Sequence, residues 1–416
     1  MRFACDYAKL TSVLSDVYGV AEDPMTNDKL RNIIFQFGKD GKAIIMAFNS
    51  NVIIKKPLQE GEYELSLADN DILVEDKFYM NLSSKELREY LNSYKNVRTT
   101  TVDKVIFENA DRSRIKCTTI ELVNLSEEDK VMYTNSGKDF PTYVSHWMFN
   151  NTTIPGNQFM YINQNANGVE TTTLNAVDIL FCTKNLLPLL QNGTDMFSSI
   201  SFDETYAVAT CSTFTTVMKN EIKEGGVFSG ISLVYKCIDM LTKLATVAVN
   251  TSTTLEVAKL QNYIYIKTAD SEVFLLYGTK LIPYNAIVDS YRKDNVITLG
   301  RIYLKDVLKR LSLVNDNIEV SIKPDDNIVT LSNSKFTQDI NINLQRNMAE
   351  LGKIRFKLMP DVFTKSIIGS DEEFTMNGAE GYTDVYVYCC KSGDNISIYF
   401  ADGTGMWFSN LRTKTY

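Results

Sequence analysis

Residues 6–18 read DYAKLTSVLSDVY, and their apolar side chains recur at positions i, i+3, i+4 and i+7. This spacing places Leu10, Val13, Leu14 and Val17 on one face, which predicts an amphipathic helix. Strands are expected next at residues 32–37, 43–48 and 51–56, and Lys39-Asp40-Gly41 marks the first turn between them. An Asp-Gly pair between two apolar runs is a strong signal for a β-hairpin.

The same order of one helix, several strands, a second helix and further strands recurs along the chain. Helices are expected at residues 83–94, 177–187, 232–244, 301–313 and 361–368. Strands are expected at residues 105–108, 114–121, 197–202, 206–211, 215–219, 254–258, 263–267, 273–277, 318–322, 328–332, 384–390 and 395–400. Helices segregated from antiparallel strands indicate an α+β fold with three repeated domains, each with two helices packed on antiparallel sheets.

The domain boundaries follow from this repeat. We expect domains at residues 1–150, 170–290 and 291–416. The stretch 127–169 is rich in Asn, Gly and Thr and only weakly patterned, so we interpret it as an insertion or exposed loop.

Composition excludes several classes of protein. The chain has 416 residues, of which 44% are hydrophobic and 23% charged, so wholesale disorder is excluded. No apolar run reaches 18 residues, which argues against a membrane span. Asp6 places an acid where a signal peptide needs an apolar stretch, so we expect a cytoplasmic protein.

Few residues suit an active site. The seven cysteines form no Cys-x-x-Cys pair and His146 is the only histidine, so neither a metal, a cofactor nor a His-based catalytic site is expected. An enzyme using acidic clusters stays open as an alternative; those clusters are Asp325, Asp326, Asp371, Glu372 and Glu373. They fall in expected turns, where solvated acids are the rule, so we expect no enzymatic activity.

Charge is unevenly distributed. The formal net charge is −8, but the windows 6–18, 83–95, 178–191, 232–244, 301–313 and 360–370 together carry +4, which leaves −12 for the rest. An acidic body with basic helices suits a protein that surrounds a polyanion without sticking to it. The alternative is that these are ordinary solvated helix faces.

Short motifs then carry a resemblance to a known family. They are Met1-Arg2-Phe3, Leu30-Arg31-Asn32-Ile33, Ala47-Phe48-Asn49-Ser50-Asn51-Val52, Glu60-Gly61-Glu62-Tyr63, Phe140-Pro141 and Ile282-Pro283-Tyr284. In order and spacing the chain resembles DNA sliding clamps, most of all the three-domain beta subunit of bacterial DNA polymerase III. It departs from the family in the 127–169 stretch and in lacking a C-terminal Met-Pro signature. With its Asn-, Lys- and Tyr-rich composition, this divergence resembles a phage-encoded clamp, which would act in the host cytoplasm.

The resemblance implies a function without bond chemistry. Two chains would close head to tail into a homodimeric ring around duplex DNA, with helices lining the hole, and would tether DNA polymerase to its template. A clamp loader is a further possible partner. The alternative is a monomeric clamp-fold accessory factor for one polymerase or for transcription.

Two sets of site residues follow from this resemblance. Sequence-independent contacts to phosphates are expected from Lys85, Arg88, Lys236, Lys243, Arg301, Lys305, Lys309 and Lys365. A pocket for short partner peptides is carried over by position to Thr210, Phe214, Pro283, Tyr284, Ile287 and Leu411. For each pocket residue, ordinary packing is the alternative.

Overall fold

The computed structural model divides the chain into two compact units, Met1–Glu170 with Tyr265–Leu275, and Thr171–Ile264 with Leu276–Tyr416. The structure describes residues 1–22, 30–68, 71, 73–136, 141–190, 196–211, 214–222, 224–289, 296–300, 307, 310–311, 313–314, 317–323, 326, 328–341, 354–358, 384–392, 395–401 and 407–411. Each unit is taken by itself below.

The first unit contains two antiparallel sheets. One has the order β5-β1-β7-β8-β9; the other contains β4-β3-β2-β6, with Glu272–Leu275 of β17 paired to β4. Their bounds are β1 Arg2–Asp6, β2 Asn32–Gly38, β3 Ala43–Phe48, β4 Val52–Pro57, β5 Tyr63–Ser66, β6 Lys77–Ser83, β7 Thr100–Asn109, β8 Arg114–Val123 and β9 Thr142–Asn150. The helices are α1 Tyr7–Ala21, α2 Ser84–Asn92, α3 Glu127–Ser136 and α4 Phe159–Ile162.

Aromatic side chains from both sheets form the core of the first unit. Phe3 of β1 lies 4.9 Å from Phe37 of β2 between ring centroids, and Phe35 lies 5.6 Å from Phe107 of β7. All four are fully buried. Burial of such large rings is the main favourable term that holds the two sheets together.

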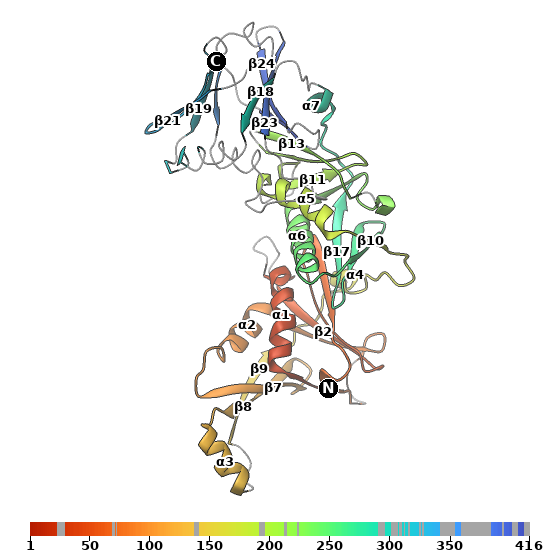
Figure 1. Cartoon of the computed structure of the whole chain (residues 1–416). Helices are drawn as coiled ribbons and strands as arrows, with labels where there is room; N and C mark the ends of the chain where they lie inside the picture. Colours follow the sequence, from red (N-terminus) through yellow and green to blue (C-terminus); the bar gives the residue numbers. More distant parts are fainter. Residues whose placement is uncertain are drawn as a thin grey trace. The chain divides into compact units, whose positions relative to one another are not determined.

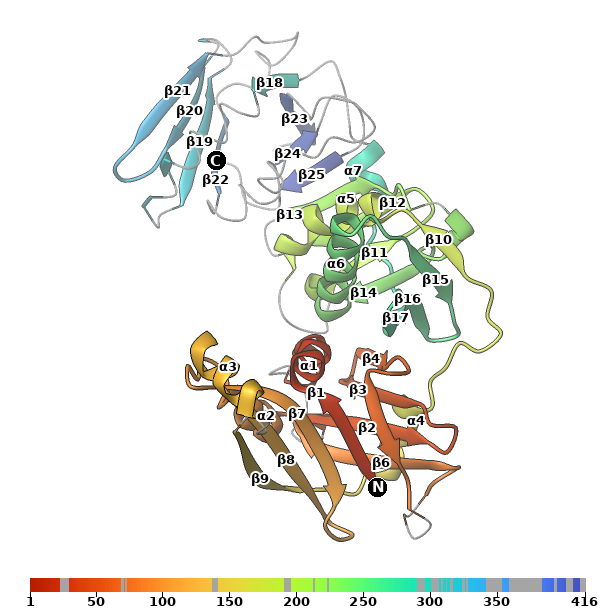
Figure 2. The same cartoon turned by 60° about the horizontal axis from the view of Figure 1, so that its bottom comes forward.

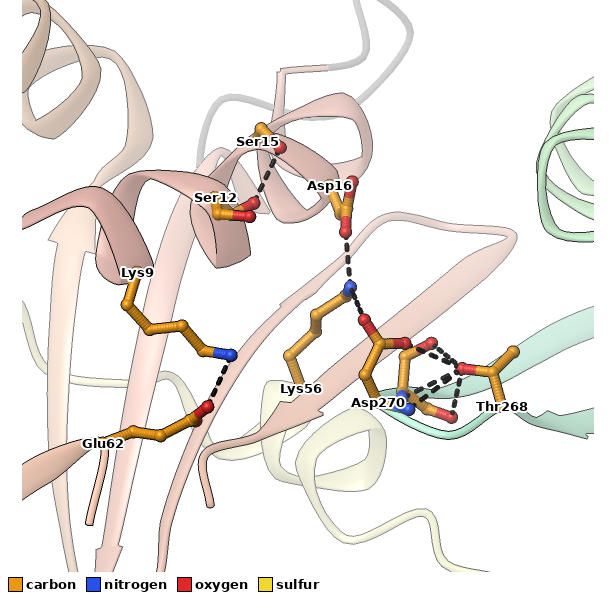
Figure 3. A network of polar contacts seen from close by, with 9 residues as sticks. Lys9, Ser12, Ser15, Asp16, Lys56, Glu62, Thr268 and Asp270 are labelled. Carbon is orange, nitrogen blue, oxygen red and sulfur yellow. Dashed lines mark hydrogen bonds and ion pairs between the residues drawn. The ribbon is translucent and has the colours of Figure 1, made fainter. Parts of the chain in front are cut away.

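Helix α1 is fixed to this core by its apolar stripe and by charge. Leu10, Val13, Leu14 and Val17 are buried, as their spacing predicts. On the polar side, the buried ammonium group of Lys56 on β4 binds both Asp16 of α1 and Asp270, 2.9 Å away in the turn before β17 (Figure 3). An amine so deeply buried needs such partners.

The second unit repeats this construction. Its helices are α5 Ala176–Leu186, α6 Tyr235–Asn250 and α7 Asn285–Asp289. Its strands are β10 Thr172–Leu174, β11 Ser199–Phe202, β12 Tyr206–Thr210, β13 Phe214–Lys219, β14 Ile231–Val234, β15 Leu255–Lys259, β16 Tyr263–Lys267, β17 Glu272–Gly278, β18 Val296–Gly300, β19 Ile318–Lys323, β20 Ile328–Ser332, β21 Thr337–Asn341, β22 Ile354–Leu358, β23 Asp384–Ser392, β24 Asn395–Ala401 and β25 Trp407–Leu411. Strands β16 and β17 contribute residues to both units.

Strand pairing reveals a threefold repeat. In each repeat, the opening strand pairs with the third strand from the end of that repeat. These pairs are β1 with β7, β10 with β15, and β18 with β23. Likewise β2 pairs with β6, β11 with β14, and β19 with β22. The α+β repeat architecture is therefore confirmed, whereas the boundaries at residues 150, 170 and 290 stay predictions.

The interpretation of residues 127–169 as a loop is wrong for most of that stretch. It forms α3, β9 and α4, and β9 pairs with β8 along its whole length, from Leu122↔Thr142 to Arg114↔Asn150. The apolar side chains of β9 point to both faces of the sheet, so this strand lacks the alternation of apolar and polar residues that marks a half-buried strand. Figure 2 shows β9 at the edge of this sheet with α3 near one end.

Candidate nucleic-acid interface

In both units a strand leads directly into a helix, and a side chain usually caps the first turn. Asp6 accepts a hydrogen bond from the backbone of Lys9 at 2.8 Å, Ser83 from Glu86 at 3.4 Å, and Asn175 from Val177 at 3.1 Å. These caps fix where α1, α2 and α5 begin. Figure 1 shows α1 beside α2 in the first unit and α5 beside α6 in the second.

Helix α2 presents two of the predicted DNA-contacting residues to solvent. Its buried side chains include Leu87, Tyr90 and Leu91, which leaves Lys85 and Arg88 on the opposite face. The Lys85 side chain is 82% exposed, and its ammonium lies 4.0 Å from a carboxylate oxygen of Glu89 one turn later. Such exposed pairs are weak, so Lys85 remains available to an anion.

Arg88 is held more firmly. Its guanidinium forms an ion pair with Glu22, the residue that follows the end of α1. The same guanidinium lies 5.7 Å from the centre of the Tyr18 ring. Burial and the neighbouring Glu22 carboxylate raise the pKa of the Tyr18 hydroxyl. The Tyr18 hydroxyl and Glu22 Oε1 are buried and have no hydrogen-bond partner among the described residues. A phosphate would therefore compete with Glu22 for Arg88.

Helix α6 carries the corresponding pair in the second unit. Cys237, Ile238 and Leu241 are buried, whereas Lys243 is exposed and lies 2.9 Å from Asp239 on the preceding turn. Lys236 is partly exposed, with its ammonium 5.6 Å from the centre of the Tyr235 ring. Basic side chains thus stand on the solvent side of a helix in each unit.

The remaining predicted DNA contacts lie outside the described residues; they are Arg301, Lys305, Lys309 and Lys365. Nearby, Val307 and Leu311 are fully buried and Arg310 is exposed, which agrees with the apolar stripe expected for residues 301–313.

The predicted pocket residues come from one part of the second unit. Phe214 of β13 pairs in register with Leu411 of β25, and the ring of Tyr284 lies 5.0 Å from that of Tyr206 in an edge-to-face arrangement. Ile287 of α7 is buried and Pro283 is exposed. Thr210 is completely buried and its hydroxyl lies 2.9 Å from that of Thr215, so it packs within the sheet.

The acidic partners of the basic side chains on α2 and α6 were not predicted from the sequence. The i,i+4 spacing of Lys85 with Glu89 and of Asp239 with Lys243 could have identified two of them. Glu22 lies 66 residues from Arg88, and no local pattern connects them.

The described residues contain no group of three or more His, Cys, Asp or Glu side chains that could hold a metal ion. Among their cysteines, Cys182 and Cys237 are fully buried, and burial raises the pKa of each thiol to about 12, which disfavours the reactive thiolate. None of the helices in the described part has the length and apolar character needed to span a membrane.

Comparison with solved structures identifies the fold. A putative DNA polymerase III beta subunit from Eubacterium rectale matches with a TM-score of 0.67 at 13% identity, over 99% of both chains. The DNA polymerase III subunit beta of Pseudomonas aeruginosa (TM-score 0.66, 12% identity) and the DNA polymerase sliding clamp of Caulobacter crescentus (0.67, 12%) match over the same shares. No protein-family model and no curated protein sequence matches the chain. From end to end, the chain has the fold of the bacterial sliding clamps.

Proposed function

We propose that this chain is a DNA sliding clamp, a processivity factor without enzymatic activity that encircles duplex DNA and tethers DNA polymerase to it. The observation that carries the proposal is the fold similarity to sliding clamps over 99% of both chains. A fold can host unrelated functions, so the proposal also needs support from the residues themselves.

The strand pairing supports closure into a ring. In each repeat, two strands lie at the ends of runs of paired strands. They are the third strand after the opening strand (β4, β13 and β21) and the last strand (β9, β17 and β25). Within the first unit, β4 pairs with the β17 segment, and within the second, β13 pairs with β25. Each junction thus joins a third strand to the last strand of the following repeat.

Two strands of these ranks are left over. They are β21 in the third repeat and β9 in the first, and no described strand pairs with their outer edges. A second copy would supply the missing partner for each, so that two chains close head to tail as a homodimer. Pairing would also cover two edges that otherwise invite aggregation.

The exposed basic side chains supply the contacts to DNA in this proposal. Lys85, Arg88, Lys236 and Lys243 stand on helix faces that the core does not use. Contacts to phosphates alone are independent of base sequence and suit a ring that moves along DNA. We extend the role to Arg301, Lys305, Lys309 and Lys365 from the sequence.

Partner proteins complete the proposal. DNA polymerase and other proteins would bind through short peptides at the region around Tyr284, Ile287 and the β13–β25 pair. A clamp loader would open the ring, and the protein would act in the cytoplasm, of the host if a phage encodes it.

A topological assay tests the proposal. The protein is assembled on nicked circular DNA, with a loader if assembly requires one, and retention is measured at rising salt before and after the circle is cut. Retention on the circle and loss from the cut DNA are expected. Equal loss from both at moderate salt would contradict encirclement, and a monomer by light scattering at micromolar concentration would favour the accessory-factor alternative.

A further inference from the structure

Helix α3 is a mostly polar helix that exposes two adjacent apolar side chains in the first unit. None of its side chains is buried, and Val131 and Met132 are each 58% exposed. Its first turn carries Glu127, Glu128 and Asp129, which is the usual place for acids on a helix. The start of the helix thus has the usual charge pattern, whereas the Val131 and Met132 side chains remain largely exposed to solvent.

Its position links it to the edge strand β9. The helix connects β8 to β9, and Leu122 at the end of β8 lies in register with Thr142 at the start of β9. Around this end, Leu122, Tyr143 and Val144 are also exposed apolar side chains. Apolar side chains clustered on a surface mark a site of association.

The proposed ring contact determines what would face this surface. Both observed junctions, β4 with β17 and β13 with β25, are antiparallel. In an antiparallel pair of β9 with β21 of a second copy, β9 begins where β21 ends. The start of β9 is the α3 end, so α3 would stand beside the end of the second copy's sheet at which β21 finishes.

Strand pairing alone would leave much of this interface uncovered. Strand β9 has nine residues and β21 has five. Five residues at about 3.3 Å each, across a sheet edge about 10 Å thick, give roughly 170 Å² per copy at each contact, or roughly 340 Å² per copy over the two contacts of the ring. A stable dimer needs about 800 Å² per partner. Further surface must contribute, and the exposed apolar surface nearest to β9 belongs to α3 and the adjoining strand ends.

We propose that α3 is a second contact element of the interface between two copies of this chain. Val131 and Met132 cover the end of the sheet β21-β20-β19-β22 of the second copy, beside the β9–β21 pair. This inference rests on the head-to-tail dimer of the proposed function. It assigns a role to the 127–136 helix that strand pairing does not require.

A dilution series tests this contact. Sedimentation velocity gives the dimer dissociation constant for the full chain and for Val131→Asp/Met132→Asp. The matched control, Thr134→Asp/Asn135→Asp, adds the same two charges to exposed polar positions of the same helix. We expect the first variant to raise the dissociation constant at least tenfold and the control to change it less than twofold. A third variant, Val131→Ala/Met132→Ala, removes apolar surface and preserves helix propensity, and should raise it at least threefold.

The outcomes separate the two proposals. A dimer whose dissociation constant is the same in all four proteins overturns the role of α3 and leaves the ring intact. A wild-type chain that stays monomeric at tens of micromolar overturns both. A photocrosslinking amino acid at position 132 gives an independent readout: crosslinks to residues 318–341 of the second copy are expected, and crosslinks only to other regions would contradict this placement.

Discussion

The ion pair between Arg88 and Glu22 gives a directional prediction about DNA binding. If Arg88 contacts phosphate, Glu22 competes for it, and Glu22→Gln should strengthen binding to duplex DNA. The Arg88 side chain is 52% exposed and Glu22 is 25% exposed, so their pair is worth about 0.5–1 kcal/mol. Removing this ion pair corresponds to roughly two- to fivefold tighter binding of DNA, since 1.4 kcal/mol is a factor of ten.

Arg88→Gln should have the opposite effect. The slope of log affinity against log salt is negative, and losing one phosphate contact makes it less steep by about 0.9 for each copy that contacts DNA. Fluorescence anisotropy with a short labelled duplex measures both quantities over a salt series.

The double variant isolates the competition. Glu22→Gln also removes a negative charge, so its benefit in the Arg88→Gln background shows how much is general repulsion. The matched control is the strand-borne pair of Lys104 and Glu64, 2.6 Å apart, where Glu64→Gln should leave the affinity unchanged. An identical gain from Glu22→Gln with and without Arg88 would refute the competition, and an unchanged slope in Arg88→Gln would refute the phosphate contact.

Two further predictions concern stability. Burial lowers the pKa of Lys55 to about 8, so between pH 8 and 9.5 the unfolded chain holds a proton that the folded chain has released. The free energy of unfolding of the wild type should therefore rise by up to about 1.4 kcal/mol per pH unit relative to that of Lys55→Met. The variant Lys39→Met, at an exposed lysine, should follow the wild type. Urea unfolding from pH 7.5 to 9.5 shows whether the curves of the wild type and Lys55→Met diverge. Tyr90→Phe removes a buried hydrogen bond of 2.6 Å to Thr119 and should cost about 1–2 kcal/mol; no change in the urea midpoint would show that the hydroxyl is dispensable.

Much of the fold could be predicted because local patterns agree with tertiary packing. The stripe Leu10, Val13, Leu14 and Val17 is buried in α1, and Ser83 caps α2. Helix α5 ends at Leu186, just before Pro188, as the proline predicts. In these segments the helical period and the end signals point to the same structure.

Strand β9 could not be predicted for a physical reason. Tyr143 and Val144, adjacent in sequence, point to opposite faces of the sheet and are both exposed, so no alternation distinguishes an inner face. Its partner β8 lies beyond an inserted helix. Phe149 at its far end is fully buried, but one residue does not establish a period.

The site was predictable only in its cations. Lys85 and Lys243 lie on the exposed sides of helices whose buried faces are periodic, so their exposure follows from the pattern. The restraint on Arg88 by Glu22 and Tyr18 arises from the packing of α1 beside α2, which only the tertiary structure supplies. The complete burial of Thr210 likewise depends on the sheet around it.

Electron microscopy of the purified full-length protein tests the central proposal most directly. Class averages of particles at a concentration above the dimer dissociation constant should show a closed ring made of two chains, with a central hole wide enough for a DNA duplex. Particles of two chains without a central hole, or single chains at every concentration, would contradict it.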